Sequence, residues 1–223
     1  MEIQQSVISK IFLLIICLSG WFALISQFFL NINSGVAGQP ELIIRYFSYF
    51  TILTNFLVTF CCTIVLLKPS SRWGHFFSRQ KTLTAITVYI LVVGLIYNLV
   101  LRFIWNPQGL QKIIDELLHS VIPFLFLLFW IFFVKKSYMK WNAFFPWLIY
   151  PLIYLVFILI RGAFSGFYPY PFVEVTKLGY KKTLFNSLGI TILFVVLFLV
   201  FIAVGNFFAR RLVLSNTSKS INN

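Results

Sequence analysis

Six apolar runs decide the class of fold that this sequence can adopt. The chain has 223 residues, and each run approaches the roughly 20 residues that a helix needs to cross a bilayer. The runs lie near residues 9–30, 43–67, 83–104, 114–134, 142–162 and 183–208. Only 10% of the residues are charged, whereas soluble domains carry about 25%. We therefore expect an all-α, polytopic integral membrane protein with six transmembrane helices, in which a domain of residues 1–212 precedes a polar C-terminal tail at 213–223.

The segments between the runs carry turn and charge signals that support these boundaries. Residues 31–40 are rich in Gly and Asn, and residues 106–109 read Asn-Pro-Gln-Gly, which is typical of a turn. Residues 68–81 and 135–140 are polar and basic. Each of these segments breaks an apolar run where a loop is needed.

The distribution of basic residues predicts the orientation of the chain. If the N-terminus is inside, the inner segments hold eleven Lys and Arg and the outer segments hold seven. Cytoplasmic loops carry the excess of Lys and Arg, so both termini are expected in the cytoplasm. The formal net charge of +13 is spread in short clusters beside apolar segments, which indicates contact with membrane lipids and not with nucleic acid. The oligomeric state stays open.

Polar side chains gather in the outer half of the expected bundle. A charged side chain at the centre of a membrane helix costs roughly 2.5–3.5 kcal/mol, so such groups should turn inward and meet. Five of the expected helices contribute them, at Thr51, Asn55, Asn98, Arg102, Asp115, His119, Tyr154, Arg161, Thr183, Asn186 and Ser187. This clustering predicts a polar cavity that opens toward the outer face.

Within this cavity, Thr51 and His119 are the candidates for chemistry. Thr51 lies about eight residues, and His119 about five, into helices that run in the same direction, at about 1.5 Å of rise per residue. A contact between the two is possible if their helices are neighbours. Asp115 precedes His119 by one turn, where it can orient the imidazole. Together they resemble a nucleophile, a base and an orienting carboxylate.

Each of these residues also has a structural interpretation. A membrane-embedded Thr commonly bonds the carbonyl four residues earlier or packs against a neighbouring helix. His119 can serve as an interhelical hydrogen bond, and Asp115 can be a solvated charge at a helix N-terminus. Arg161 can extend to lipid headgroups. No CxxC motif, Cys/His cluster or nucleotide-binding fingerprint is present, so no metal and no cofactor is expected.

Three segments resemble motifs of one known family, the androgen-inducible six-helix membrane proteins. Tyr49-Phe50-Thr51, followed by an apolar stretch with Asn55, resembles the family's Tyr-x-Thr motif. The segment from Leu118 to Phe124 resembles its His-x-x-x-Pro-Phe motif, and the segment from Phe167 to Phe172 resembles its Tyr-Pro-Phe motif. The match covers residues 45–190 in the same order and spacing, and it is most similar to the bacterial branch.

The resemblance implies an activity. Animal members of the family are threonine hydrolases in the membrane, which cleave fatty acid esters of hydroxy fatty acids with one Thr and one His. Carried onto this chain, these are Thr51 and His119, with Thr54 as a competing hydroxyl. The implied location is the bacterial cytoplasmic membrane.

The sequence therefore leads to two functional hypotheses. The first is a membrane-embedded hydrolase of lipid esters in which Asn55, Asn98 or Arg102 stabilises the oxyanion or holds a carboxylate. The second is a lipid-binding or transport protein that uses the same cavity, with Arg102 or Arg161 holding the ligand. The outer loop at residues 162–182 is expected to lie in the membrane interface as a lid.

Overall fold

The computed structural model is a bundle of helices. It describes residues 2–4 and 6–221, with side chains through Arg211. No β-strand occurs in this part of the chain; its only extended pairing is a single bridge between Ile3 and Val134. The α-helices are α1 (Val7–Ile32), α2 (Gln39–Phe47), α3 (Phe50–Leu67), α4 (Arg72–Phe77), α5 (Gln80–Leu99), α6 (Gly109–Glu116), α7 (Ile122–Phe133), α8 (Ile149–Ser165) and α9 (Val175–Ile221). Shorter turns of 3-10 or π geometry are η1 (Leu101–Phe103), η2 (Leu117–Val121), η3 (Trp141–Leu148) and η4 (Pro171–Val173).

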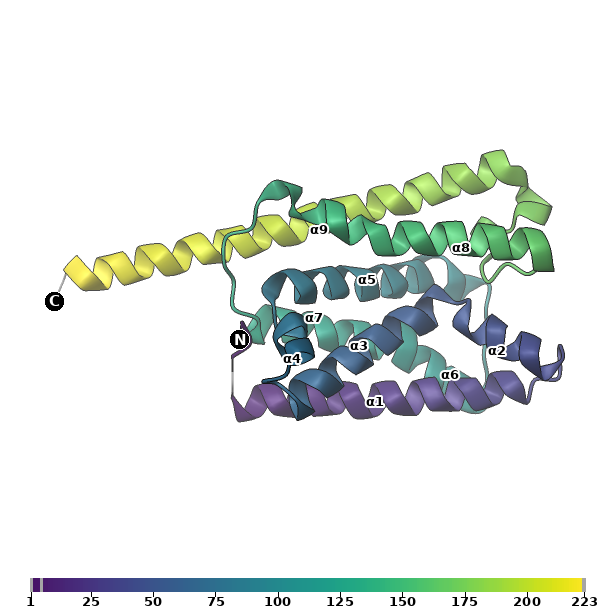
Figure 1. The fold of residues 1–223 in the computed structure, drawn as a ribbon, viewed down its shortest axis with the longest axis horizontal. Helices are drawn as coiled ribbons and strands as arrows, with labels where there is room; N and C mark the ends of the chain where they lie inside the picture. Colours follow the sequence, from purple (N-terminus) through teal and green to yellow (C-terminus); the bar gives the residue numbers. More distant parts are fainter. Residues whose placement is uncertain (1, 5, 222–223) are drawn as a thin grey trace.

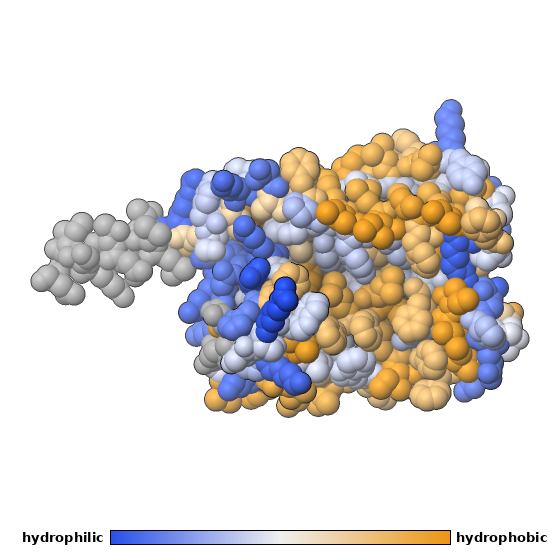
Figure 2. Space-filling model, in the orientation of Figure 1, coloured by the Kyte–Doolittle hydropathy of each residue, from blue (hydrophilic) through white to orange (hydrophobic). Residues whose placement is uncertain are grey.

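Six helical segments are long and apolar enough to cross a membrane, which confirms the expected all-α polytopic fold. They are Val7–Ile32, Phe50–Leu67, Gln80–Phe103, Gly109–Phe133, Trp141–Ser165 and Val175–Arg211. Their axes run side by side, and the chain begins and ends at the end of the bundle opposite α2 (Figure 1). Hydrophobic residues cover much of the middle of the visible face, and hydrophilic residues gather toward its two ends (Figure 2).

The expected second helix is divided in two, which corrects the single run at 43–67. The helix α2 ends at Phe47, and α3 begins at Phe50 after Tyr49 adopts an extended conformation. The carbonyl that the break exposes at Ser48 accepts a hydrogen bond from the Tyr154 hydroxyl at 2.8 Å. A consequence is that Thr51 is the second residue of its helix, and not about eight residues inside it.

The expected long loop at 162–182 is also shorter in the structure. The helix α8 continues to Ser165, where Gly166 adopts a left-handed conformation with φ 69° and ends it. The segment then forms η4, and α9 begins at Val175 with a kink at Gly179. The helix continues through Ile221, so most of the predicted tail at 213–223 extends α9. Its last two residues lie outside the described part of the chain.

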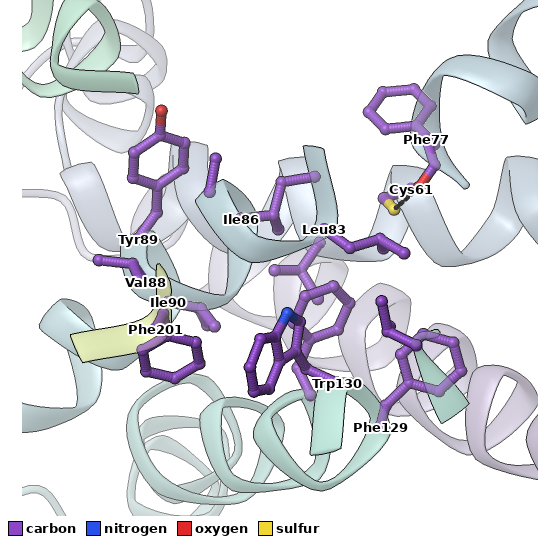
Figure 3. Packing of buried hydrophobic residues seen from close by; sticks show 14 of the residues in the cluster. Cys61, Phe77, Leu83, Ile86, Val88, Tyr89, Ile90, Phe129, Trp130 and Phe201 are labelled. Carbon is purple, nitrogen blue, oxygen red and sulfur yellow. Dashed lines mark hydrogen bonds between the residues drawn. The ribbon is translucent and has the colours of Figure 1, made fainter. Parts of the chain in front are cut away.

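The core surrounds α5. Leu83, Val88 and Ile90 are almost completely buried on this helix, and they pack toward Trp130 of α7 and Phe201 of α9 (Figure 3). The Trp130 indole N–H donates to the Thr84 hydroxyl at 2.9 Å. This hydrogen bond is buried, and it leaves neither the indole N–H nor the hydroxyl oxygen without a partner. It therefore fixes how α5 and α7 pack.

Helices α1 and α3 approach each other closely at Gly20. A Cβ atom added there would lie 2.1 Å from the Thr59 hydroxyl oxygen, 3.0 Å from its Cγ2 atom and 3.1 Å from its Cβ atom. Thr59 is fully buried. Small residues allow membrane helices to pack at short distance, and Gly20 does so here.

We predict that Gly20→Ala destabilises the bundle by about 1–3 kcal/mol, because the added methyl forces α1 and α3 apart. The midpoint of thermal unfolding in detergent measures this effect. Gly189→Ala is the matched control, because a Cβ there meets no atom within 4 Å. Equal midpoints for both variants would contradict the close contact.

Candidate functional site

A π-helical turn interrupts the fourth membrane span at the position of His119. In η2 the N–H of Ile122 bonds to the carbonyl of Leu117, five residues earlier. Pro123, the next residue, has no N–H to donate. The carbonyls of Leu118 and His119 therefore lack the donors that a regular α-helix provides at i+4. Turns of this type are frequent at functional sites.

Two asparagines satisfy these carbonyls. The Asn55 amide on α3 donates to the carbonyl of Leu118 at 3.0 Å and also to that of Thr51 at 2.9 Å. The Asn98 amide on α5 donates to the carbonyl of His119 at 3.3 Å. Both side chains were candidates for an oxyanion site. In the structure their amide N–H groups hold the π turn between α3 and α5.

The imidazole of His119 is oriented by the backbone of Asp115. Its Nδ1 lies 2.9 Å from the Asp115 carbonyl oxygen and 3.7 Å from the nearer carboxylate oxygen. A carbonyl only accepts, so Nδ1 carries the proton, and Nε2 of the neutral ring is the acceptor. The Asp115 carboxylate accepts instead from the Tyr97 hydroxyl at 2.8 Å. The Tyr97 ring stacks on the imidazole with centroids 4.0 Å apart.

Thr51 lies at the N-terminus of α3, in contact with Tyr170. The Tyr170 hydroxyl accepts a hydrogen bond from the Thr51 backbone N–H at 3.2 Å and lies 3.3 Å from the Thr51 hydroxyl. Burial raises the pKa of Tyr170 to about 12, so this phenol keeps its proton. Thr54, the competing hydroxyl, is fully buried and pairs with the Tyr150 hydroxyl at 3.0 Å.

Two cavities meet at these residues, and the second contains more polar groups than the first. The apolar cavity, of about 90 Å³, lies among α3, α5, α8 and α9, with Val92, Leu155 and Phe194 in its wall. The second cavity, of about 420 Å³, is lined by polar, aromatic and aliphatic side chains, mostly from α1, α2, α5 and α6, and we call it the vestibule. Thr51, His119 and Tyr170 line both cavities, whereas Thr54 lines neither. No hydrogen bond joins Thr51 to His119 in the described residues.

The two candidate arginines are held by protein groups. Arg102 contacts both carboxylate oxygens of Glu116, at 2.6 and 2.7 Å, and donates to the Asn98 side-chain oxygen at 2.9 Å. Arg161 donates to Glu41 at 2.8 Å, and its guanidinium lies 4.7 Å from the centre of the Phe167 ring. Neither arginine lines either cavity.

Arg161 belongs to a clamp that holds the loop after α8. Glu41 and Arg45 form the ion pair that their spacing on α2 predicts, at 2.7 Å, and Glu41 accepts from Arg161 through the same oxygen. Arg45 also lies 4.5 Å from the centre of the Phe167 ring. The clamp fixes Phe167, three residues before Tyr170. The aromatic composition of this loop predicts a lid at the interface, but it does not single out Tyr170.

Comparison with known proteins adds no relative. No protein family, curated protein or solved structure matches the chain. The resemblance to the androgen-inducible proteins, and the roles that it implies, therefore stay predictions. Within the described residues no group of three or more His, Cys, Asp and Glu side chains is placed to hold a metal ion.

The clamp predicts how stability depends on pH. The hydrogen bond from Arg45 is the largest effect on Glu41, and with Arg161 it holds the pKa of Glu41 below 4.5 despite partial desolvation. A lowered folded-state pKa contributes stability above the unfolded pKa, and this stability is lost as the pH falls through the folded value. Glu41→Gln should therefore lower the unfolding midpoint at pH 7, and the difference from wild type should decrease as the pH falls through the lowered folded-state pKa of Glu41.

The expected difference at pH 7 is about 2–4 °C, which corresponds to about 1 kcal/mol for a chain of this size. Glu174→Gln is the control, because its partner Lys177 is 77% exposed and the pair should contribute little. A Glu41→Gln midpoint equal to that of wild type at pH 7 would show that the clamp does not stabilise the fold.

Proposed function

We propose that this protein is a membrane-embedded hydrolase of fatty-acyl lipid esters, with Thr51 as nucleophile and His119 as base. The observation that supports it best is that Thr51 and His119 both line the apolar cavity and the vestibule, in which polar side chains are present. An ester is the junction between an apolar chain and a polar alcohol. A substrate with the carbonyl end of its acyl chain in the apolar cavity has its ester bond beside these two residues.

The first chemical step is acylation. The Thr51 hydroxyl oxygen attacks the acyl carbonyl carbon while Nε2 of His119 takes the hydroxyl proton. The tetrahedral intermediate collapses, the bond to the alcohol oxygen breaks, and His119 returns the proton to the leaving alcohol. The Asp115 carbonyl supports this role because it fixes the tautomer with Nε2 unprotonated. The step requires Thr51 and His119 to approach when substrate binds, as catalytic pairs commonly do.

The second step is deacylation by water, which enters through the vestibule. His119 takes a proton from the water, the hydroxide oxygen attacks the acyl-Thr51 carbonyl, and the fatty acid leaves as Thr51 regains its proton. Tyr170 is the group placed to stabilise the oxyanion in both steps. Its oxygen already accepts from the Thr51 N–H, so its own proton is available for a developing negative charge.

The location follows from the fold and from the resemblance. The structure supports a multi-pass membrane protein, and the resemblance to the bacterial branch favours the bacterial cytoplasmic membrane. The excess of Lys and Arg at the end that carries the termini favours a vestibule that opens to the outside.

A lipid-like fluorophosphonate should label the purified wild-type protein on Thr51. Thr51→Ala and His119→Ala should lose the label and reduce ester turnover by at least about 10³-fold, because one removes the nucleophile and the other removes the base. Thr51→Ser should keep measurable turnover. Thr54→Ala is the matched control and should be labelled like wild type.

Labelling that survives in Thr51→Ala, or that is lost in a folded Thr54→Ala variant, would overturn the assignment of the nucleophile. If folded wild-type protein is not labelled and cleaves no ester, a second function gains support. That function is lipid binding or transport through the same two cavities, which is favoured by the absence of a Thr51–His119 hydrogen bond. The ion pairing of Arg102 and Arg161 does not favour either as its ligand-binding group.

Tyr170→Phe should lower kcat by about 10²-fold, the usual effect of losing one oxyanion donor. KM should change little, because the aromatic ring remains in the cavity wall. Steady-state kinetics on one ester separates the two constants. Tyr168→Phe is the control, because no hydrogen bond joins its hydroxyl to Thr51. A change in KM alone would show that Tyr170 only shapes the cavity.

A further inference from the structure

The charges around the vestibule restrict what can occupy it. Its polar side chains are mostly neutral, and in the part of the chain that the structure describes no Lys or Arg lines it. The one carboxylate in the wall belongs to Asp115, which is 6% exposed. Besides Thr51 and His119, the neutral polar residues in the wall include Gln27, Asn31, Ser34, Gln111 and the tyrosines at 46, 49, 97 and 170.

The cations nearest to this wall are already paired. Arg102 is bound to Glu116 through both carboxylate oxygens. Arg45 and Arg161 share Glu41, and both lie over the ring of Phe167 outside the wall. An anionic group in the vestibule would therefore lie near Asp115 without a cation in contact, and an unpaired, partly desolvated charge is unfavourable.

The wall also offers groups that suit hydroxyls. The Gln27 and Gln111 side chains hydrogen-bond to each other at 2.8 Å across α1 and α6. Each amide keeps a further donor or acceptor. Such neutral groups form hydrogen bonds with an alcohol at little cost in free energy, because no charged group has to be desolvated.

We propose that the alcohol part of the substrate is uncharged and carries hydroxyl groups, as in an acylglycerol, and that it bears no free carboxylate or phosphate. This inference rests on the proposed hydrolase function and specifies its substrate class. Water and the ester give a fatty acid and a neutral alcohol, and His119 carries the proton from Thr51 to that alcohol. The proposed substrate differs from the one that the family resemblance implies, in which the alcohol part carries a carboxylate.

The test compares two esters with the same acyl chain on the full-length protein in detergent. Monooleoylglycerol should be cleaved with a kcat/KM at least about ten-fold above that of the oleate ester of hydroxystearic acid. Gln111→Lys places a cation in the vestibule wall and should reduce this ratio at least about ten-fold. Gln108→Lys, which adds the same charge outside the wall, should leave the ratio unchanged. A wild-type preference for the anionic ester, or none, overturns the inference.

A binding measurement separates this inference from the hydrolase proposal. The Thr51→Ala protein is titrated with hexadecyl glyceryl ether and with the phosphate monoester of this ether. Neither compound contains a carboxylic ester bond that the protein could cleave. Tighter binding of the neutral ether supports the inference even if wild type cleaves nothing, in which case only the hydrolase proposal fails. Equal binding, tighter binding of the phosphate, or binding of neither contradicts the inference.

Discussion

The arrangement of the candidate site depends on the carbonyl groups that Pro123 leaves without a helical donor. In a membrane span such groups cost several kcal/mol unless another group bonds to them. Asn55 and Asn98 provide those bonds from two different helices. The π turn is therefore the point at which α3, α5 and the fourth span are held together, and His119 lies in it. Gly94 allows this approach, since a Cβ there would lie 3.0 Å from the His119 carbonyl oxygen.

Near this turn, the backbone and the side chain of Asp115 contact different residues. Its carbonyl oxygen accepts a hydrogen bond from Nδ1–H of His119, whereas its carboxylate accepts one from the Tyr97 hydroxyl. The stacked Tyr97 ring restricts the imidazole from one face. Asp115 lies beside His119, and its backbone oxygen makes a closer contact with Nδ1 than its carboxylate does. Sequence spacing places a residue near His119, and it does not decide which atom of that residue makes the bond.

Apolar runs of membrane length predicted the spans, because their length is set by the thickness of the bilayer. The break before Phe50 was not predicted, since residues 43–67 stay largely apolar across it. What stabilises the break is the hydroxyl of Tyr154, more than 100 residues away in the chain. Tyr170 was missed for the same reason: its contact with Thr51 is tertiary. Arg161 was predicted to hold a ligand or to extend to lipid headgroups, and its pairing with Glu41 was missed because that residue lies on α2, outside its own span.

The position of Thr51 connects the break in the second run to the proposed chemistry. In a continuous helix, Thr51 would present its hydroxyl beside a backbone whose N–H groups are already bonded within the helix. At the second position of α3, its N–H is instead one of the N-terminal donors that have no partner in the helix, and Tyr170 accepts from it. A carbonyl oxygen that accepts from the Tyr170 hydroxyl would lie beside the Thr51 hydroxyl. The break thus places the proposed nucleophile on the residue whose N–H holds Tyr170, at the boundary between the apolar cavity and the vestibule.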